Sequence, residues 1–285
     1  MKAKNIFLST GLVLSAVLGV SSNAQAASFT TKFSPNPFNP ATDSTRDIEL
    51  LSIIRNDNKE ISDFKLVDRV NIISNVGTLG PASTDRGENA TNPTGFPPTE
   101  QPSASAIAAY LNRDANGKIN LNNIIDTEDG GEFELDVFFE SAVASNNQEL
   151  DNFFFWERGG EGNQYGNSDI KVQAIDAFGG LLGPAVTINR SLWQNAGFQI
   201  DTTEAGQQNV GAWALSFKDL GLNNGTLVGG LKLISETSFN GPDFKVVAAD
   251  VFERTPVPEP TTMLGLGSVA ALALLRRRQT KKTAC

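Results

Sequence analysis

The chain has 285 residues and carries 32 acidic against 23 basic side chains, a formal net charge of −9. It contains no histidine, and its single cysteine is the last residue, Cys285. These counts exclude Ser-His-Asp and Cys-His catalytic sites, and zinc or copper sites built from histidine or cysteine, in the body of the protein. The negative charge repels phosphate backbones, so nucleic acid is not an expected partner. With one cysteine no disulfide forms within the chain, and the fold must rest on its hydrophobic core.

The first 26 residues have the pattern of a secretory signal peptide. Lys2 and Lys4 precede an apolar stretch at residues 6–20, and the small residues Ala24 and Ala26 stand where signal peptidase requires them. We therefore expect cleavage after Ala26 and secretion across the inner membrane. An uncleaved N-terminal anchor is the alternative.

Residues 27–256 are the size of one domain, which we expect to be the exported ectodomain. The two terminal segments hold seven of the basic residues and one of the acidic ones, so this part keeps 16 basic and 31 acidic residues and a formal charge near −15. Such a surface attracts calcium and other cations.

Short runs of alternating apolar residues recur along the ectodomain between glycine and asparagine turns, which is typical of an all-β sandwich. We expect ten strands, at residues 47–54, 64–73, 132–140, 152–157, 169–176, 185–189, 198–202, 210–217, 227–234 and 244–252. Ten strands suggest two packed sheets, a jelly-roll or lectin-like β-sandwich.

Two segments interrupt this pattern. Residues 77–105 are rich in proline, glycine and small polar residues, which predicts a long flexible loop without strands. Residues 103–111 predict one short helix, with Ser103 or Ser105 as N-cap.

The segment after the helix, residues 112–123, resembles a calcium-binding loop. Ligand positions one, three, five and nine carry the oxygen-bearing side chains of Asn112, Asp114, Asn116 and Asn120. Only one of these is a carboxylate, and an asparagine replaces the glutamate expected at position twelve. A plain Asn/Asp/Gly turn is therefore the favoured interpretation, with Ca²⁺ as the one cofactor that the pattern suggests. The acidic residues that follow, from Asp126 to Glu132, add carboxylates without a spacing that demands a site.

The tryptophans are candidates for sugar-binding platforms or for core positions. In residues 152–157, Phe153 and Phe155 face one way and Phe154 and Trp156 the other, which favours a central strand covered on both sides. Trp193 lies in a polar stretch and is the best candidate for exposure. We therefore name Trp193, and after it Trp156, as sugar-binding candidates. Burial in the core is the favoured interpretation for Trp156 and the alternative for Trp193.

The C-terminal residues 257–285 form a distinct unit. Val257, Pro258, Glu259 and Pro260 precede an apolar run at residues 261–275, which the basic cluster Arg276, Arg277 and Arg278 follows. The prolines prevent any helix from continuing into the run. If helical, it spans about 22 Å, less than the roughly 30 Å of a hydrocarbon core, so as a transmembrane segment it is marginal.

This order of elements resembles the PEP-CTERM sorting domain. The resemblance implies that an exosortase-type membrane enzyme recognises and cuts the segment, which anchors the chain in the membrane until then. It further implies export to the cell surface or extracellular matrix of a Gram-negative bacterium. A plain hydrophobic helix with positive-inside flanking charge is the alternative interpretation.

The middle of the chain resembles the ectodomains of exosortase-dependent surface proteins. The expected function is a structural or binding component of the envelope or exopolysaccharide. The alternative is a calcium-assisted carbohydrate-binding module. A third hypothesis is a glycoside hydrolase that uses a pair of carboxylates. No such pair stands out among the acidic residues, so we expect no enzyme.

Overall fold

The computed structural model describes residues 29–76 and 82–253. The signal peptide with Ala24 and Ala26 lies outside the described residues, as does the C-terminal unit with its apolar run at residues 261–275. Within the described ranges, no helix has the length and apolar character needed to cross a membrane.

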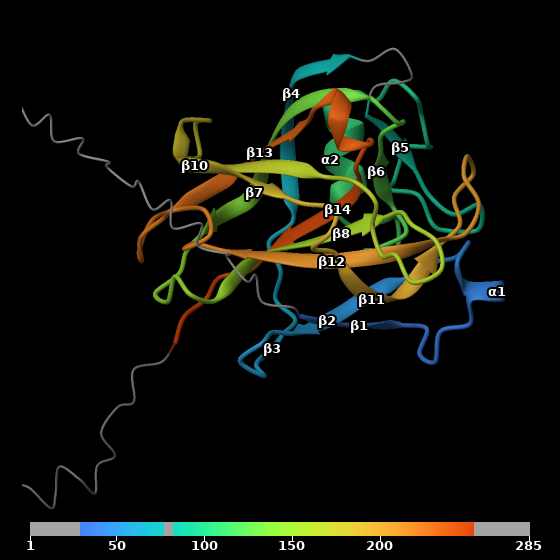
Figure 1. The fold of residues 1–285 in the computed structure, drawn as a ribbon, viewed down its shortest axis with the longest axis horizontal. Coiled ribbons are helices and arrows are strands. Elements are labelled where there is room, and N and C mark those ends of the chain that lie inside the picture. Colours follow the sequence, from blue (N-terminus) through green and yellow to red (C-terminus); the bar gives the residue numbers. More distant parts are fainter. Residues whose placement is uncertain (1–28, 77–81, 254–285) are drawn as a thin grey trace, which may run out of the picture.

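The strands form three antiparallel sheets stacked in layers (Figure 1). The five-stranded sheet has the order β10 (Leu181–Ile188), β9 (Ile170–Ile175), β13 (Val228–Ser235), β7 (Glu132–Val143) and β4 (Val67–Val76). The six-stranded sheet has the order β11 (Gln194–Ile200), β12 (Gln208–Ser216), β8 (Asp151–Arg158), β14 (Asp243–Ala248), β6 (Ile124–Asp126) and β5 (Ser83–Asp85). The small sheet has the order β1 (Thr30–Ser34), β2 (Glu49–Ile54) and β3 (Glu60–Ile61).

The six-stranded sheet is the middle layer, because each of its faces contributes to a separate core. Phe153 and Phe155 of β8 join the core shared with the five-stranded sheet. Phe154 and Trp156 join the second core, shared with the small sheet. Every residue of β8 is buried, as the aromatic alternation predicted. The all-β class is confirmed, but the expectation of two sheets is wrong, since a third sheet covers the second face of β8.

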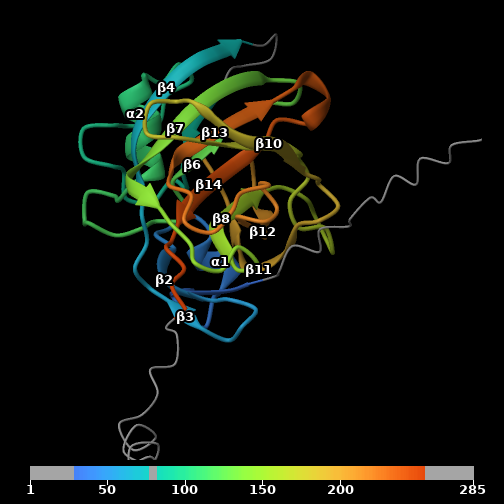
Figure 2. The ribbon, with the colours of Figure 1, turned by 90° about the vertical axis from the view of Figure 1, so that its left-hand side faces the viewer.

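The helix α2 (Ala104–Leu111) closes one side of the larger core and lies beside β4 (Figure 2). Its N-cap is Ser103, whose hydroxyl accepts a hydrogen bond from the Ala106 amide at 3.2 Å. Ile107 and Tyr110 on the helix are completely buried. The predicted short helix is therefore confirmed. Elsewhere in the part of the chain that the structure describes, the helical segments are the single turns α1 (Pro40–Asp43) and η1 (Thr237–Phe239).

The expectation of a strandless segment at residues 77–105 is wrong. β5 lies within it and pairs with β6, and Thr84 and Thr99 form a further antiparallel bridge. β5 consists of Ser-Thr-Asp, so no apolar alternation marks it in the sequence. The ten predicted strands all overlap strands of the structure, whereas β1, β3, β5 and β6 were not predicted.

The edge strand β10 is irregular. Its pairing with β9 shifts register between Leu182 and Val186, in a stretch that contains Gly183 and Pro184. Proline lacks the amide hydrogen that a neighbouring strand would bind, and it is typical of sheet edges.

Candidate functional site

The predicted calcium-loop residues take part in hydrogen bonds that fold the loop. Oδ1 of Asp114 accepts bonds from the amides of Asn116 and Lys118, both at 2.9 Å, which is the geometry of an Asx turn. The side chain of Asn116 donates to Thr91 Oγ1 at 3.2 Å. The geometry of Asp114 thus agrees with the turn interpretation.

The other two predicted ligands connect the loop to segments that are distant in the sequence. Asn112 Nδ2 donates to the Val67 carbonyl at 2.7 Å. The Asn120 side chain accepts a bond from the Ile48 amide at 3.1 Å and donates to Asp47 at 2.7 Å. The hydrogen bonds of the four predicted ligands lead to different segments rather than to one central point.

A buried ammonium lies at the start of this loop. Lys245 on β14 is completely buried and donates to the carbonyls of Tyr110 and Asn112, the latter at 3.1 Å. These carbonyls lie at the C-terminal end of α2, where a positive charge is stabilised. Burial lowers the pKa of Lys245 to about 7, while the charge of Asp114 opposes that shift.

The two sugar-binding candidates are both buried. Trp156 is 2 % exposed and donates to Thr31 Oγ1 at 2.9 Å. Trp193 is 6 % exposed and donates to the Ser168 carbonyl at 2.7 Å, so its predicted exposure is wrong. The side chain of Trp193 fits against Gly166 and Gly211. An added Cβ would lie 2.5 Å from the indole at Gly166 and 2.6 Å from the Trp193 Cβ at Gly211. Neither indole offers a platform on the surface.

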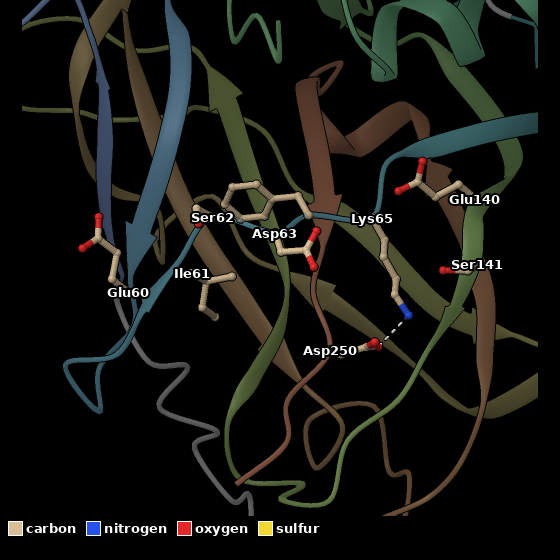
Figure 3. A pocket seen from close by; sticks show the side chains of 9 residues that line it. Glu60, Ile61, Ser62, Asp63, Lys65, Glu140, Ser141 and Asp250 are labelled. Carbon is tan, nitrogen blue, oxygen red and sulfur yellow. Dashed lines mark hydrogen bonds and ion pairs between the residues drawn. The ribbon is translucent and has the colours of Figure 1, made fainter. Parts of the chain in front are cut away.

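A polar pocket opens beside the segment that follows β3 (Figure 3). It has a volume of about 450 Å³ and is lined by residues 60–65, Glu140, Ser141 and Asp250. The Lys65 ammonium pairs with Asp250 at 2.7 Å and also donates to the Ala142 carbonyl. Glu60, Asp63 and Glu140 add further carboxylates, and all three are exposed. The pocket therefore presents hydrogen-bond acceptors and a net negative charge.

A second group of carboxylates gathers at the end of the six-stranded sheet. Asp85, Asp126 and Glu204 each place a carboxylate oxygen within 4.8 Å of the others. Asp85 pairs in register with Ile124, so Asp126, two residues further along β6, is its diagonal neighbour on the same face. Glu204 comes from the turn between β11 and β12, where Thr203 donates to Asp85 Oδ1 at 2.7 Å.

Arg158 and Asp243 continue this cluster along the sheet. Phe244 pairs with Ile125, which places Asp243 beside Asp126, and Arg158 is in turn the partner of Asp243 on β8. The buried guanidinium of Arg158 lies 2.6 Å from Asp243 and 3.2 Å from Asp126. It also donates to Thr202 at 2.7 Å, so its bonds reach the same turn that carries Glu204.

The pKa values in the cluster reflect crowded negative charge. A hydrogen bond with Glu100 raises the pKa of Glu204 to about 8, and burial and the charges of Asp126 and Asp85 add to the effect. Burial raises the pKa of Asp243 well above its usual range, although Arg158 lowers it. Sequence reasoning missed Asp85 and Glu204, because the cluster joins segments that are far apart in the chain. The pairing of β5 with β6 brings Asp85 to Asp126, and the turn between β11 and β12 adds Glu204.

Comparison with known proteins identifies the C-terminal unit. Residues 256–279 match the family model of the PEP-CTERM protein-sorting motif, which confirms the predicted resemblance. The motif implies an exported protein with a C-terminal sorting tail that an exosortase-type enzyme processes. No curated protein and no solved structure matches the chain.

Proposed function

We propose that this protein, which carries a PEP-CTERM sorting motif, is a structural or binding component of the bacterial envelope or exopolysaccharide. The observation that carries the proposal is the motif at residues 256–279. Such a signal is recognised by a processing enzyme. It directs the export and sorting of the protein, but it assigns the protein no reaction. We propose no catalytic activity for this protein.

The body of the protein suits a surface role. Two hydrophobic cores share one sheet and stabilise the fold by apolar packing on both of its faces. Because Cys285 is the one cysteine in the sequence, folding requires no disulfide within the chain and no oxidising enzyme. The formal charge near −15 between the two terminal segments favours a hydrated surface that repels other anionic polymers.

The sorting step is tested with the full-length precursor in a host that has an exosortase-type enzyme, and in the same strain without it. We expect the wild type to lose its tail and leave the membrane only when the enzyme is present. Replacing Pro258, Glu259 and Pro260 by alanine should leave the larger precursor in the membrane fraction. Glu253→Ala, just outside the motif, is the matched control and should be processed normally. Equal processing of both variants would show that the enzyme does not recognise the motif, and it would remove the basis of the proposed surface role.

The polar pocket supports a second candidate, the binding of an uncharged, hydroxyl-rich polysaccharide. Its carboxylates and the hydroxyls of Ser62 and Ser141 suit the hydroxyl groups of a sugar, and its volume of about 450 Å³ is in the range of ligand pockets. Its negative charge disfavours acidic polysaccharides.

Calorimetric titration with neutral bacterial polysaccharides tests this second candidate. We expect saturable binding that Glu140→Gln weakens, whereas Glu161→Gln, on an exposed loop elsewhere, leaves it unchanged. Assay of new reducing ends during the titration should show no turnover. An unaltered affinity in Glu140→Gln, or the absence of any binding polysaccharide, would leave only the structural role.

A further inference from the structure

We infer that Asp85, Asp126 and Glu204 form a binding site for a divalent cation, and that the ion they select is Ca²⁺. The site goes beyond the proposed surface role, and it does not involve the loop at residues 112–123. Asp85 and Asp126 come from adjacent strands, whereas Glu204 comes from the turn after β11.

The spacing of the three carboxylates fits a calcium ion. Their nearest oxygens lie within 4.8 Å of one another. Calcium binds oxygen at about 2.3–2.6 Å, so oxygens on opposite sides of one ion stand about 5 Å apart. Three carboxylate oxygens at this separation can therefore reach one ion between them, and water can fill the remaining positions.

The environment of Asp85 independently favours the binding of a positive ion. Asp85 is 1 % exposed, and its Oδ1 accepts bonds from the Arg86 amide and from Thr203, both at 2.7 Å. Its Oδ2 is also buried and has no hydrogen-bond partner among the residues described. A carboxylate that has lost its water needs a counter-charge or further donors, because isolated burial of the ion is costly.

The guanidinium groups of the neighbouring arginines donate no hydrogen bond to Asp85, although the charge of Arg158 attracts it through space. Arg158 directs its guanidinium to Asp126, Asp243 and Thr202. The Arg86 side chain donates to Asn92 and to backbone carbonyls of its own turn. Both guanidinium groups therefore form their hydrogen bonds with other residues. A cation between Asp85, Asp126 and Glu204 would neutralise the negative charge that remains.

The chemistry of the ligands selects the ion. All three are hard oxygen donors, which suit Ca²⁺ or Mg²⁺ better than zinc or copper. The ligands come from two strands and a turn, an adaptable arrangement that suits calcium, whereas Mg²⁺ demands near-ideal octahedral geometry at about 2.1 Å. Extracellular calcium modules bind in the range of about 10⁻⁴–10⁻³ M, and we expect a similar affinity here.

The test is titration of the chelator-treated full-length protein with CaCl₂ by calorimetry, followed by thermal unfolding with Ca²⁺ or with EDTA. We expect one site, a higher melting temperature with Ca²⁺, and at least about tenfold weaker binding of Mg²⁺. Glu204→Gln changes an exposed turn residue and should weaken Ca²⁺ binding by at least about tenfold, because one of the three ligand carboxylates is lost. Asp85→Asn should do the same.

Two matched variants distinguish this site from other sources of affinity. Asp114→Asn removes the carboxylate of the predicted calcium loop, and Glu161→Gln removes an exposed charge elsewhere; both should bind Ca²⁺ like the wild type. Absence of Ca²⁺ binding by the wild type would overturn the inference. Full binding by Glu204→Gln, or loss of binding in Asp114→Asn, would do so as well. Since Glu204 is exposed, its variant decides the question even if Asp85→Asn fails to fold.

Discussion

At the scale of single residues, Glu157 is an acid enclosed within the protein. Its side chain is completely buried on β8, and one oxygen accepts a bond from the Asn167 amide at 3.0 Å. Its other oxygen has no hydrogen-bond partner within the described ranges. Burial raises the pKa of Glu157 to about 8, although the neighbouring Ser168 and Asn167 lower it. The folded protein therefore holds this group as a neutral acid at pH 7.

This proton makes stability depend on pH. In the unfolded chain Glu157 loses its proton near pH 4.5, whereas the folded protein keeps it up to about pH 8. Between these values the folded state binds more protons, so Glu157 lowers the free energy of unfolding as the pH rises, by up to about 1.4 kcal/mol per pH unit. Glu157→Gln should equal the wild type near pH 4.5 and exceed it in stability at pH 8.

Denaturant unfolding of both proteins at several pH values measures the difference. Glu161→Gln is the control, because Glu161 is exposed, and its difference from the wild type should not change with pH. A constant difference between Glu157→Gln and the wild type would contradict the prediction.

Alternation along one strand identifies which residues are buried, but not which distant residues meet. The apolar period of β8 was enough to predict a core position for Trp156. The burial of Trp193 was not predictable, because it depends on the close approach of Gly166 and Gly211 from other segments. The contact of Asp85 with Glu204 likewise arises from tertiary structure and leaves no local pattern.

At the scale of elements, β13 depends on a glycine. It lies between β7 and β9, and its pairing with β7 shifts register between Val228 and Gly230. A Cβ at Gly230 would lie 2.1 Å from the Val137 carbonyl oxygen of the neighbouring strand. The close approach of these two backbones thus excludes a side chain.

Gly230→Ala should therefore destabilise the protein by about 1–3 kcal/mol or more, because the backbone of a central strand must move. Gly206→Ala is the matched control, since a Cβ there meets nothing within 4 Å, and its stability should stay within about 0.5 kcal/mol of the wild type. Circular dichroism during thermal unfolding compares the two. A Gly230→Ala protein as stable as the control would show that the strands can separate without cost.

Elements with a long apolar face were predictable, whereas very short ones were not. The helix α2 combines an apolar sequence with a serine N-cap, so both its position and its start could be predicted. β5 and β6 have three residues each, too few to show an alternating pattern, and they become strands by pairing with each other and, for β6, with β14. β1 has the sequence Thr-Thr-Lys-Phe-Ser, with one apolar residue, and becomes a strand through its pairing with β2.

At the scale of the whole molecule, the middle sheet joins the two cores into one folding unit. Trp156 lies in the core under the small sheet, and Trp213 lies in the core on the opposite face. Because β8 and β12 carry residues of both cores, loss of one core removes the support of the other. We expect residues 29–253 to unfold in a single transition.

Single-tryptophan proteins test this cooperativity. One retains Trp156 and the other Trp213, with phenylalanine at the remaining two positions. Their fluorescence should shift to longer wavelength at the same denaturant concentration, since both indoles start buried. An earlier transition for Trp156 would instead make the small sheet a separately unfolding layer.

The number of layers was the part of the architecture that the sequence analysis missed. A strand with aromatic residues on both faces needs cover on both sides, which a sandwich of two sheets cannot provide. The double-sided pattern of β8 thus already indicated three layers. Its second cover could not be assigned, because it comes from β1, β2 and β3, two of which have little pattern of their own.

The irregular edge strand β10 bears on how the protein behaves at high local density. At a cell surface or in a matrix, identical molecules lie close together, and a regular open sheet edge invites strands from a neighbour. The proline and the register shift in β10 leave few amides available along that edge. β10 is therefore a poor template for backbone pairing between crowded copies, and any cohesion along this edge must come from side chains, cations or glycans.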